Sequence, residues 1–139
     1  MSWRLLLPLA ACLSGLALPA AAQDTAAAST PLSLELNKLE EADGICRAYF
    51  IARNQTGQDV ANLELDTFLF DRDAIILQRL ALPFGPVGTR MRIVSFDFNL
   101  SCNAIGSVYV NDVLSCEPLE AAACAAALQT SSRAAAALD

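Results

Sequence analysis

The sequence of 139 residues contains no histidine, the side chain that proteins use most often as a general base and as a metal ligand. It also lacks a Gly-x-Ser-x-Gly nucleophile motif, a glycine-rich phosphate loop and a His-Glu-x-x-His zinc motif. No two cysteines have the Cys-x-x-Cys spacing of structural zinc sites. The sequence therefore predicts no catalytic residue, no metal site and no cofactor.

Basic residues are scarce as well, because nine Lys and Arg stand against fifteen Asp and Glu, for a net charge of −6. The charge is spread along the chain rather than gathered in one block. An acidic protein of this kind is not expected to bind nucleic acid or an anionic membrane surface. The excess of acidic side chains favours solubility.

Residues 1–22 have the pattern of a secretory signal peptide. Arg4 supplies the positive start, Leu5–Leu18 is the apolar stretch, and three alanines precede Gln23, where we expect the mature chain to begin. The apolar stretch is shorter than the ~20 residues that span a bilayer, so we expect no integral membrane span in the mature chain. The predicted location is therefore periplasmic or secreted.

An alternative processing site lies inside the apolar stretch. The residues before and including Cys12, Leu-Ala-Ala-Cys, match a bacterial lipoprotein box, and cleavage there would leave a lipidated Cys12. No Arg-Arg pair is present, so the twin-arginine export route is not indicated. Residues 23–31 are polar and alanine-rich, which predicts a disordered lead-in.

Two alternating stretches are the strongest structural signal in the sequence. Apolar residues recur at every second position in 46–53 and again in 63–70, which predicts two half-buried strands. The turn residues 54–57 (Asn-Gln-Thr-Gly) lie between them, so we expect an antiparallel hairpin. In the second stretch Phe68 and Phe70 share the parity of the acidic residues, which indicates that both faces are covered near its end.

Four more strands are expected, at 32–37, 75–82, 90–98 and 107–110. Two prolines and two glycines in 83–88 should end the fourth strand, and Asn111-Asp112 should turn the sixth. The fifth strand changes parity, which indicates a β-bulge or a crossing from one sheet to the other. The predicted core residues are Leu34, Leu36, Ala48, Phe50, Leu63, Leu65, Leu69, Met91, Ile93, Val108 and Val110.

The last part of the chain changes character. Pro118-Leu119-Glu120 and the alanine-rich residues 121–129 predict one short helix. Residues 130–139 have no apolar face and are expected to form a flexible or weakly helical tail. The fold class is thus mainly β: an Ig-like antiparallel β-sandwich of about six strands, with a short C-terminal helix, over residues 32–129.

Four cysteines, Cys46, Cys102, Cys116 and Cys124, remain in the mature chain. An even number in an exported protein predicts two disulfides, and three pairings exist. If successive strands run in opposite directions, Cys46 and Cys102 lie at one end of the sandwich. The sixth strand then places Cys116 toward the other end, close in sequence to Cys124 on the helix. We therefore predict Cys46–Cys102 and Cys116–Cys124. A reversal at Asn111-Asp112 would instead let Cys116 compete for Cys102.

Acidic residues give two candidate sites, each with a simpler structural interpretation. Glu64 and Asp66 lie two apart on one strand face and form a possible carboxylate pair, but a solvated face opposite Arg47 and Arg53 is favoured. Asp71, Arg72 and Asp73 form a turn in which calcium binding is conceivable, but the Asp-x-Asp-x-Asp-Gly loop is absent.

Two further groups of polar residues have a simple explanation. Arg90, Arg92 and Tyr109 are candidates for an anion-binding edge, although solvent-facing arginines are common. The triplets that begin at Asn54 and Asn99 match the glycosylation pattern, and we interpret both as turn residues because the signal peptide has a bacterial character.

The series CRAYFIARNQTG, LFDRD, CNAIGSVYVNDVLSC and CAAALQTSSR resembles small uncharacterised exported proteins of Gram-negative bacteria that are grouped loosely as signal-sequence-domain proteins. The resemblance covers Leu32 to about Arg133 and implies a periplasmic Ig-like domain without catalytic residues. The family's twin-arginine signal is absent from this sequence. A more distant similarity is to bacterial Ig-like modules with an Asn-x-Thr-Gly turn, which act in adhesion or assembly.

Together these patterns predict a non-catalytic binding or accessory module of the cell envelope. Its expected mode of binding is the addition of a partner's strand to an exposed edge of the sandwich. The alternative hypothesis is a small periplasmic hydrolase that uses acidic residues. That activity requires a cleft with two carboxyl groups of perturbed pKa.

Overall fold

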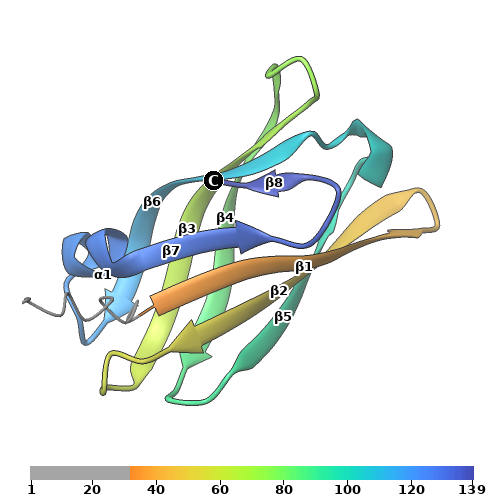
Figure 1. The fold of residues 1–139 in the computed structure, drawn as a ribbon. Coiled ribbons are helices and arrows are strands. Elements are labelled where there is room, and N and C mark those ends of the chain that lie inside the picture. Colours follow the sequence, from red (N-terminus) through yellow and green to blue (C-terminus); the bar gives the residue numbers. More distant parts are fainter. Residues whose placement is uncertain (1–31) are drawn as a thin grey trace, which may run out of the picture.

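The computed structural model describes residues 32–139, which form two four-stranded sheets packed face to face (Figure 1). The first sheet has the strand order β5-β2-β1-β7, and the second has the order β4-β3-β6-β8. Side chains from both sheets meet in one buried apolar cluster. The fold is therefore a β-sandwich. The predicted signal peptide (1–22) and lead-in (23–31) lie outside the described residues.

The first sheet is built around a hairpin. Its strands are β1 (Leu32–Ala42), β2 (Ile45–Asn54), β5 (Arg92–Phe98) and β7 (Leu128–Ser132). The turn between β1 and β2 uses Asp43 and Gly44, both at positive φ, a conformation that glycine adopts without steric cost. β5 pairs with β2 antiparallel, whereas β7 pairs with β1 parallel.

The second sheet is organised around β3. Its strands are β3 (Val60–Phe70), β4 (Ile76–Val87), β6 (Ser107–Glu117) and β8 (Ala137–Leu138). β4 and β6 pair with β3 on either side, and the two-residue β8 pairs parallel with β6. A 3-10 turn, η1 (Cys102–Ala104), links β5 to β6, and the helix α1 (Ala121–Ala127) links β6 to β7. Two parallel pairs and eight strands correct the expected six antiparallel ones.

Three aromatic rings hold the two sheets together at the centre of the core. Phe50 of β2 and Phe96 of β5 come from the first sheet, and Phe84 of β4 comes from the second. The ring centroids of Phe50 and Phe84 are 5.6 Å apart, and those of Phe84 and Phe96 are 5.2 Å apart. Both pairs have the edge-to-face geometry that aromatic rings prefer.

Most of the predicted core residues are buried. The buried ones are Leu34, Leu36, Ala48, Phe50, Leu63, Leu65, Leu69 and Val108. Val110 is half-buried, and the prediction was wrong for Met91 and Ile93, whose side chains are 56% and 60% exposed. Val94, Phe96 and Phe98 are the β5 residues that face the core instead.

The predicted change of parity in β5 does not occur. The β2–β5 register runs without interruption from Cys46 opposite Phe98 to Ala52 opposite Arg92, so β5 contains no bulge and stays in one sheet. Val94, Phe96 and Phe98 take alternate positions on its inner face, so Ile93 points to the outer face, and Met91 lies just before the strand. Apolar character at this end of the strand therefore does not imply burial.

The predicted hairpin between the two alternating stretches is wrong, because β2 and β3 lie in different sheets. The chain crosses from one sheet to the other through residues 55–59, and Asn54 directs the crossing. The Nδ2 atom of Asn54 donates to the carbonyl oxygen of Val87 on β4 at 2.9 Å and to that of Gln58 at 2.8 Å. These bonds tie the end of β2 to the second sheet.

The fourth strand continues through the residues that were expected to end it. β4 contains Pro83 and Pro86, and both Phe84 and Val87 are buried. Because β4 lies at the edge of its sheet, a proline can stand where no partner strand needs its missing N–H.

The C-terminal predictions also need correction. β6 continues past Asn111-Asp112, where the register with β3 shifts, so no turn forms there. The helix ends at Ala127 rather than at 129, and residues 130–139, expected to be a flexible tail, contribute to β7 and β8. The Arg133 N–H donates to the Leu36 carbonyl oxygen at 2.9 Å, which extends the attachment to β1.

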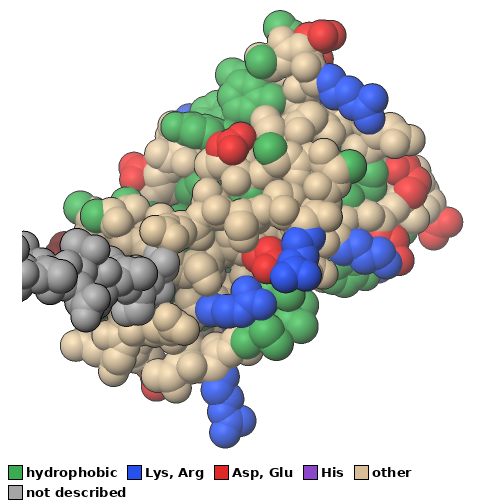
Figure 2. All heavy atoms as spheres, viewed as in Figure 1, with side chains coloured by type: hydrophobic (Ala, Val, Ile, Leu, Met, Phe, Trp, Pro, Cys, Tyr) green, Lys and Arg blue, Asp and Glu red, His purple; other side chains and the backbone are tan. Residues whose placement is uncertain are grey.

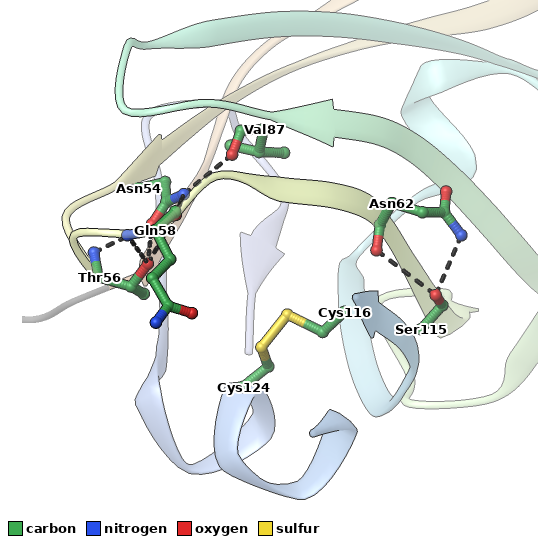
Figure 3. Close-up of a disulfide and its surroundings, with 8 residues drawn as sticks. All are labelled: Asn54, Thr56, Gln58, Asn62, Val87, Ser115, Cys116 and Cys124. Carbon is green, nitrogen blue, oxygen red and sulfur yellow. Dashed lines mark hydrogen bonds between the residues drawn. A yellow bond between two sulfur atoms is a disulfide. The ribbon is translucent and has the colours of Figure 1, made fainter. Parts of the chain in front are cut away.

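Two disulfides join the same cysteine pairs that the strand directions favour. Cys46–Cys102 connects β2 to η1, and Cys116–Cys124 connects the end of β6 to α1 (Figure 3). Because β6 does not reverse at Asn111-Asp112, Cys116 is carried away from Cys102. Two disulfides indicate an oxidising compartment outside the cytoplasm. Within the described part of the chain, no helix combines the length and apolar character needed to cross a bilayer.

Candidate functional site

The sandwich has four edge strands, and three of them are protected against pairing with another chain. β7 and β8 have five and two residues, and the turn between them is held by the Ser132 hydroxyl, which donates to the Ala136 carbonyl oxygen at 2.6 Å. β4 carries two prolines and several register shifts. Proline, bulges and short length are among the devices by which proteins block sheet edges.

β5 carries none of these three protections, and its charged residues are Arg92 at its start and Asp97, which is paired with Arg47. It has seven residues, contains no proline, and pairs regularly with β2 on one side only among the described strands. Alternate N–H and C=O groups of such an edge strand point away from the sheet and can bind another strand. Figure 1 shows β5 along the free side of the first sheet, opposite β7.

Exposed apolar side chains stand beside this free edge. Ile93 lies on the outer face of the sheet opposite Ile51 of β2, and Met91 precedes it just before the strand begins. Arg90 and Arg92 flank Met91, and neither has an ion-pair or hydrogen-bond partner among residues 32–139. We call Arg90–Ile93 and the free edge of β5 the β5 surface.

Charges on the rest of this sheet face neutralise one another. Arg47 donates to both carboxylate oxygens of Asp97 at 2.7 and 2.9 Å, and these hydrogen bonds hold the pKa of Asp97 below its ordinary value. Lys38 lies 2.8 Å from Glu40. Figure 2 shows such basic and acidic side chains next to one another across this face. Arg90 and Arg92 differ in having no such carboxylate.

Glu35 is nearly buried at the centre of this face. Asn37 donates to it at 2.7 Å, and Arg133 and Arg53 lie 3.5 and 3.6 Å away. The hydrogen bond from Asn37, and then the two guanidinium groups, lower the pKa of the Glu35 carboxyl group despite its burial. Arg53 therefore pairs within its own sheet, and not with the acids of β3 as the sequence indicated.

The two members of the predicted carboxylate pair of β3, Glu64 and Asp66, do not share a hydrogen-bond network. The two oxygens of Asp66 accept hydrogen bonds from Arg79 at 2.9 and 3.0 Å and from Asn111 at 2.7 Å. The hydrogen bonds from Arg79 and then Asn111 hold the pKa of Asp66 below its ordinary value. With both oxygens engaged, Asp66 is poorly suited to exchange a proton, and Glu64 has no part in this network.

The acidic turn after β3 uses its carboxylate locally. Asp71 Oδ1 accepts the backbone N–H groups of Asp73 and Ile75 at 2.9 and 2.8 Å, which is the geometry of an Asx turn. Among residues 32–139 no cluster of three or more potential metal ligands is found. The turn interpretation of Asp71 and Asp73 fits these contacts.

The other polar candidates are explained by their positions. Asn54 is buried, and its Oδ1 accepts from the Thr56 N–H and hydroxyl groups, so this triplet closes a turn (Figure 3). In the second triplet Ser101 caps η1. Tyr109 lies on β6 of the second sheet, where its ring contacts Phe70, so the structure does not bring it together with Arg90 and Arg92.

The sequence reasoning missed which edge is open. The signal was present, because Pro83 and Pro86 mark β4 as a blocked edge, whereas residues 92–98 contain no proline. Met91 and Ile93 were assigned to the core because Arg90 and Arg92, which alternate with them, were expected to face water.

The fold and its surfaces define a disulfide-bonded two-sheet β-sandwich. No protein-family model matches the chain, and no curated protein matches it. A solved structure, that of IrmA from Escherichia coli, is similar with a TM-score of 0.59 at 12% sequence identity, over 71% of this chain and 89% of that chain. At this identity the likeness concerns the fold alone.

Proposed function

We propose that the protein is a non-catalytic binding module of the cell envelope, and that the β5 surface binds an extended segment of an envelope partner. The observation that carries the proposal is an unblocked edge strand with exposed Met91 and Ile93 beside it. Backbone hydrogen bonds to the free edge would supply affinity, and side chains next to the edge would supply specificity.

Charge and apolar character indicate the chemistry of the partner segment. An added strand places every second side chain on the outer face, next to Ile93, so that residue should be apolar. The partnerless Arg90 and Arg92 favour an acidic residue at the corresponding end of the segment. We therefore expect an extended segment with alternating apolar residues and at least one Asp or Glu.

The location in the periplasm or outside the cell is part of the same proposal. The signal-peptide pattern of residues 1–22 and the two disulfides support it, as does the resemblance to exported signal-sequence-domain proteins with Ig-like domains. The engaged oxygens of Asp66 favour a binding role over the alternative of a hydrolase that uses acidic residues.

A photoreactive amino acid at position 93 tests the proposal in living Gram-negative cells. We expect illumination to join the protein to a partner, and peptide mass spectrometry to place the joined residue in an extended segment. Ile93→Lys adds a charge of the kind that blocks edge strands. A protein with this substitution and no photoreactive residue should no longer bind the same partner.

Leu114 provides the matched control, because it is 49% exposed on β6 of the other sheet, a strand that pairs with β3 along its length and is not part of the β5 surface. A photoreactive residue at position 114 should give no such product, and Leu114→Lys should leave the capture unchanged. Equal products from both positions, or turnover of an ester or glycan without any captured partner, would overturn the proposal.

A further inference from the structure

A cleft of about 510 Å³ lies where four separate segments meet, away from the β5 surface. Its walls come from β1, from the turn after β3, from η1 with the residues that follow it, and from the connection between β7 and β8. The lining residues are Asn37, Lys38, Leu39, Arg72, Cys102, Asn103, Ile105, Gly106, Arg133, Ala134 and Ala135. Its volume falls within the roughly 300–1,000 Å³ of small-molecule sites.

The charged residues that line the cleft are all basic, although the chain as a whole is acidic. Lys38, Arg72 and Arg133 line the cleft, while none of the described lining residues is Asp or Glu, although the sequence contains fifteen of these acids. Nine Lys and Arg are present, and Arg4 lies outside the described residues, so three of the remaining eight gather at this one place.

Arg72 is the cation that is left unneutralised. The neighbouring Asp71 carboxylate is turned toward the backbone N–H groups of its own turn, and Arg72 has no ion-pair or hydrogen-bond partner within residues 32–139. Lys38 and Arg133 have partners in Glu40 and Glu35, but the Arg133 pair is long at 3.5 Å. An anion that enters the cleft would therefore meet the unpaired guanidinium group of Arg72 and two cations, Lys38 and Arg133, that are already paired with glutamates.

The walls of the cleft are locked in place. A Cβ atom on Gly106 would lie 2.5 Å from the backbone oxygen of Asp71, so only glycine lets the turn with Arg72 pack against this segment. The Gly106 N–H also donates to the Phe70 carbonyl oxygen at 2.8 Å. Cys102, in the same segment, is fixed by its disulfide to Cys46 and by its N–H, which donates to the Glu41 carboxylate at 2.8 Å. A fixed site of this kind lowers the entropy cost of binding.

We propose that this cleft binds a small organic anion through a carboxylate or phosphate group held by Arg72, with Lys38 and Arg133 in support. A planar guanidinium group can donate two parallel hydrogen bonds to either group. Leu39 and Ala134, which are half-buried in the cleft wall, offer a surface for the apolar part of the ligand. None of the cleft residues belongs to the β5 surface, so this site is independent of the proposed function.

The test is a nuclear magnetic resonance titration of the isotope-labelled mature protein at constant ionic strength. The probes are inorganic phosphate, glucuronate as a carboxylated sugar, and glucose as its neutral counterpart. We expect saturable shifts confined to the cleft segments with phosphate, glucuronate or both, which tells the two anionic groups apart, and no such shifts with glucose. Arg72→Gln should weaken the binding by about tenfold, since it removes a charge-assisted bidentate contact.

Arg47→Gln is the matched control, because it removes the same charge from an exposed arginine that belongs neither to the cleft nor to the β5 surface. This variant should bind as the parent protein does. Shifts that are spread over the molecule or do not saturate, or an equal weakening by both substitutions, would overturn the proposal and leave only a general effect of charge.

Discussion

Replacing Phe50 with alanine is expected to lower the free energy of unfolding by about 3–5 kcal/mol. The Phe50 side chain is 1% exposed, and its ring contacts Phe84 of the opposite sheet and Phe96 of the neighbouring strand. Its removal leaves a cavity where the two sheets meet, and the rings of β4 and β5 lose their common partner. Thermal and chemical denaturation measure the loss, which should lower the melting temperature by roughly 10 °C or more.

Phe70→Ala serves as the comparison for this experiment. Phe70 is half-buried on the outer side of the second sheet, where its ring contacts Tyr109, so its loss leaves no cavity between the sheets. It should destabilise the protein distinctly less than Phe50→Ala. If Phe50→Ala melts within a degree or two of the parent, the assignment of Phe50 to the contact between the sheets is wrong.

Removing the Cys46–Cys102 disulfide should cost more stability than removing Cys116–Cys124. The first closes a loop with a sequence separation of 56 and the second one with a separation of 8. Because a longer closed loop restricts the unfolded chain more, the loop-entropy model gives about 4 kcal/mol for the first and about 2.5 kcal/mol for the second. Urea denaturation of two paired Cys→Ala variants, each lacking one bridge, measures both losses.

The two disulfides act at different places in the fold. The first holds η1 to β2, whereas the second holds α1 to the end of β6. Loss of Cys116–Cys124 should therefore leave the cooperativity of unfolding unchanged. An equal or larger loss of stability from the short bridge would contradict the entropic explanation of both values.

The strands were predictable where one residue pattern is enough to define them. Residues 46–53 alternate cleanly because β2 lies between β1 and β5 and has one face in the core. The alternating pattern of a strand does not identify the strand with which it pairs. The hairpin expected from the turn at 54–57 fails because the side-chain bonds of Asn54 carry the chain to the other sheet, and these bonds depend on Val87, which is distant in sequence.

Other errors come from treating composition as if it determined burial. Pro83 and Pro86 were expected to end a strand, although an edge position tolerates them. Residues 130–139 are polar and alanine-rich and were expected to have no apolar face, but Ala136 and Leu138 are buried in the core, and β1 and β6 supply backbone partners. The exposure of Met91 and Ile93 could not be found from apolar character, and it is this exposure that makes β5 the candidate binding edge.

Hydrogen exchange at β5 tests the central claim most directly. The partner segment identified by photo-crosslinking is prepared as a synthetic peptide, and exchange of the backbone amides is measured with and without it. If the segment adds to the edge, the amides of residues 92–98 that point away from β2 should become protected, while those of the β4 edge should exchange as before. Unchanged exchange in β5, or protection that falls on another surface, would contradict the claim that β5 is the binding edge.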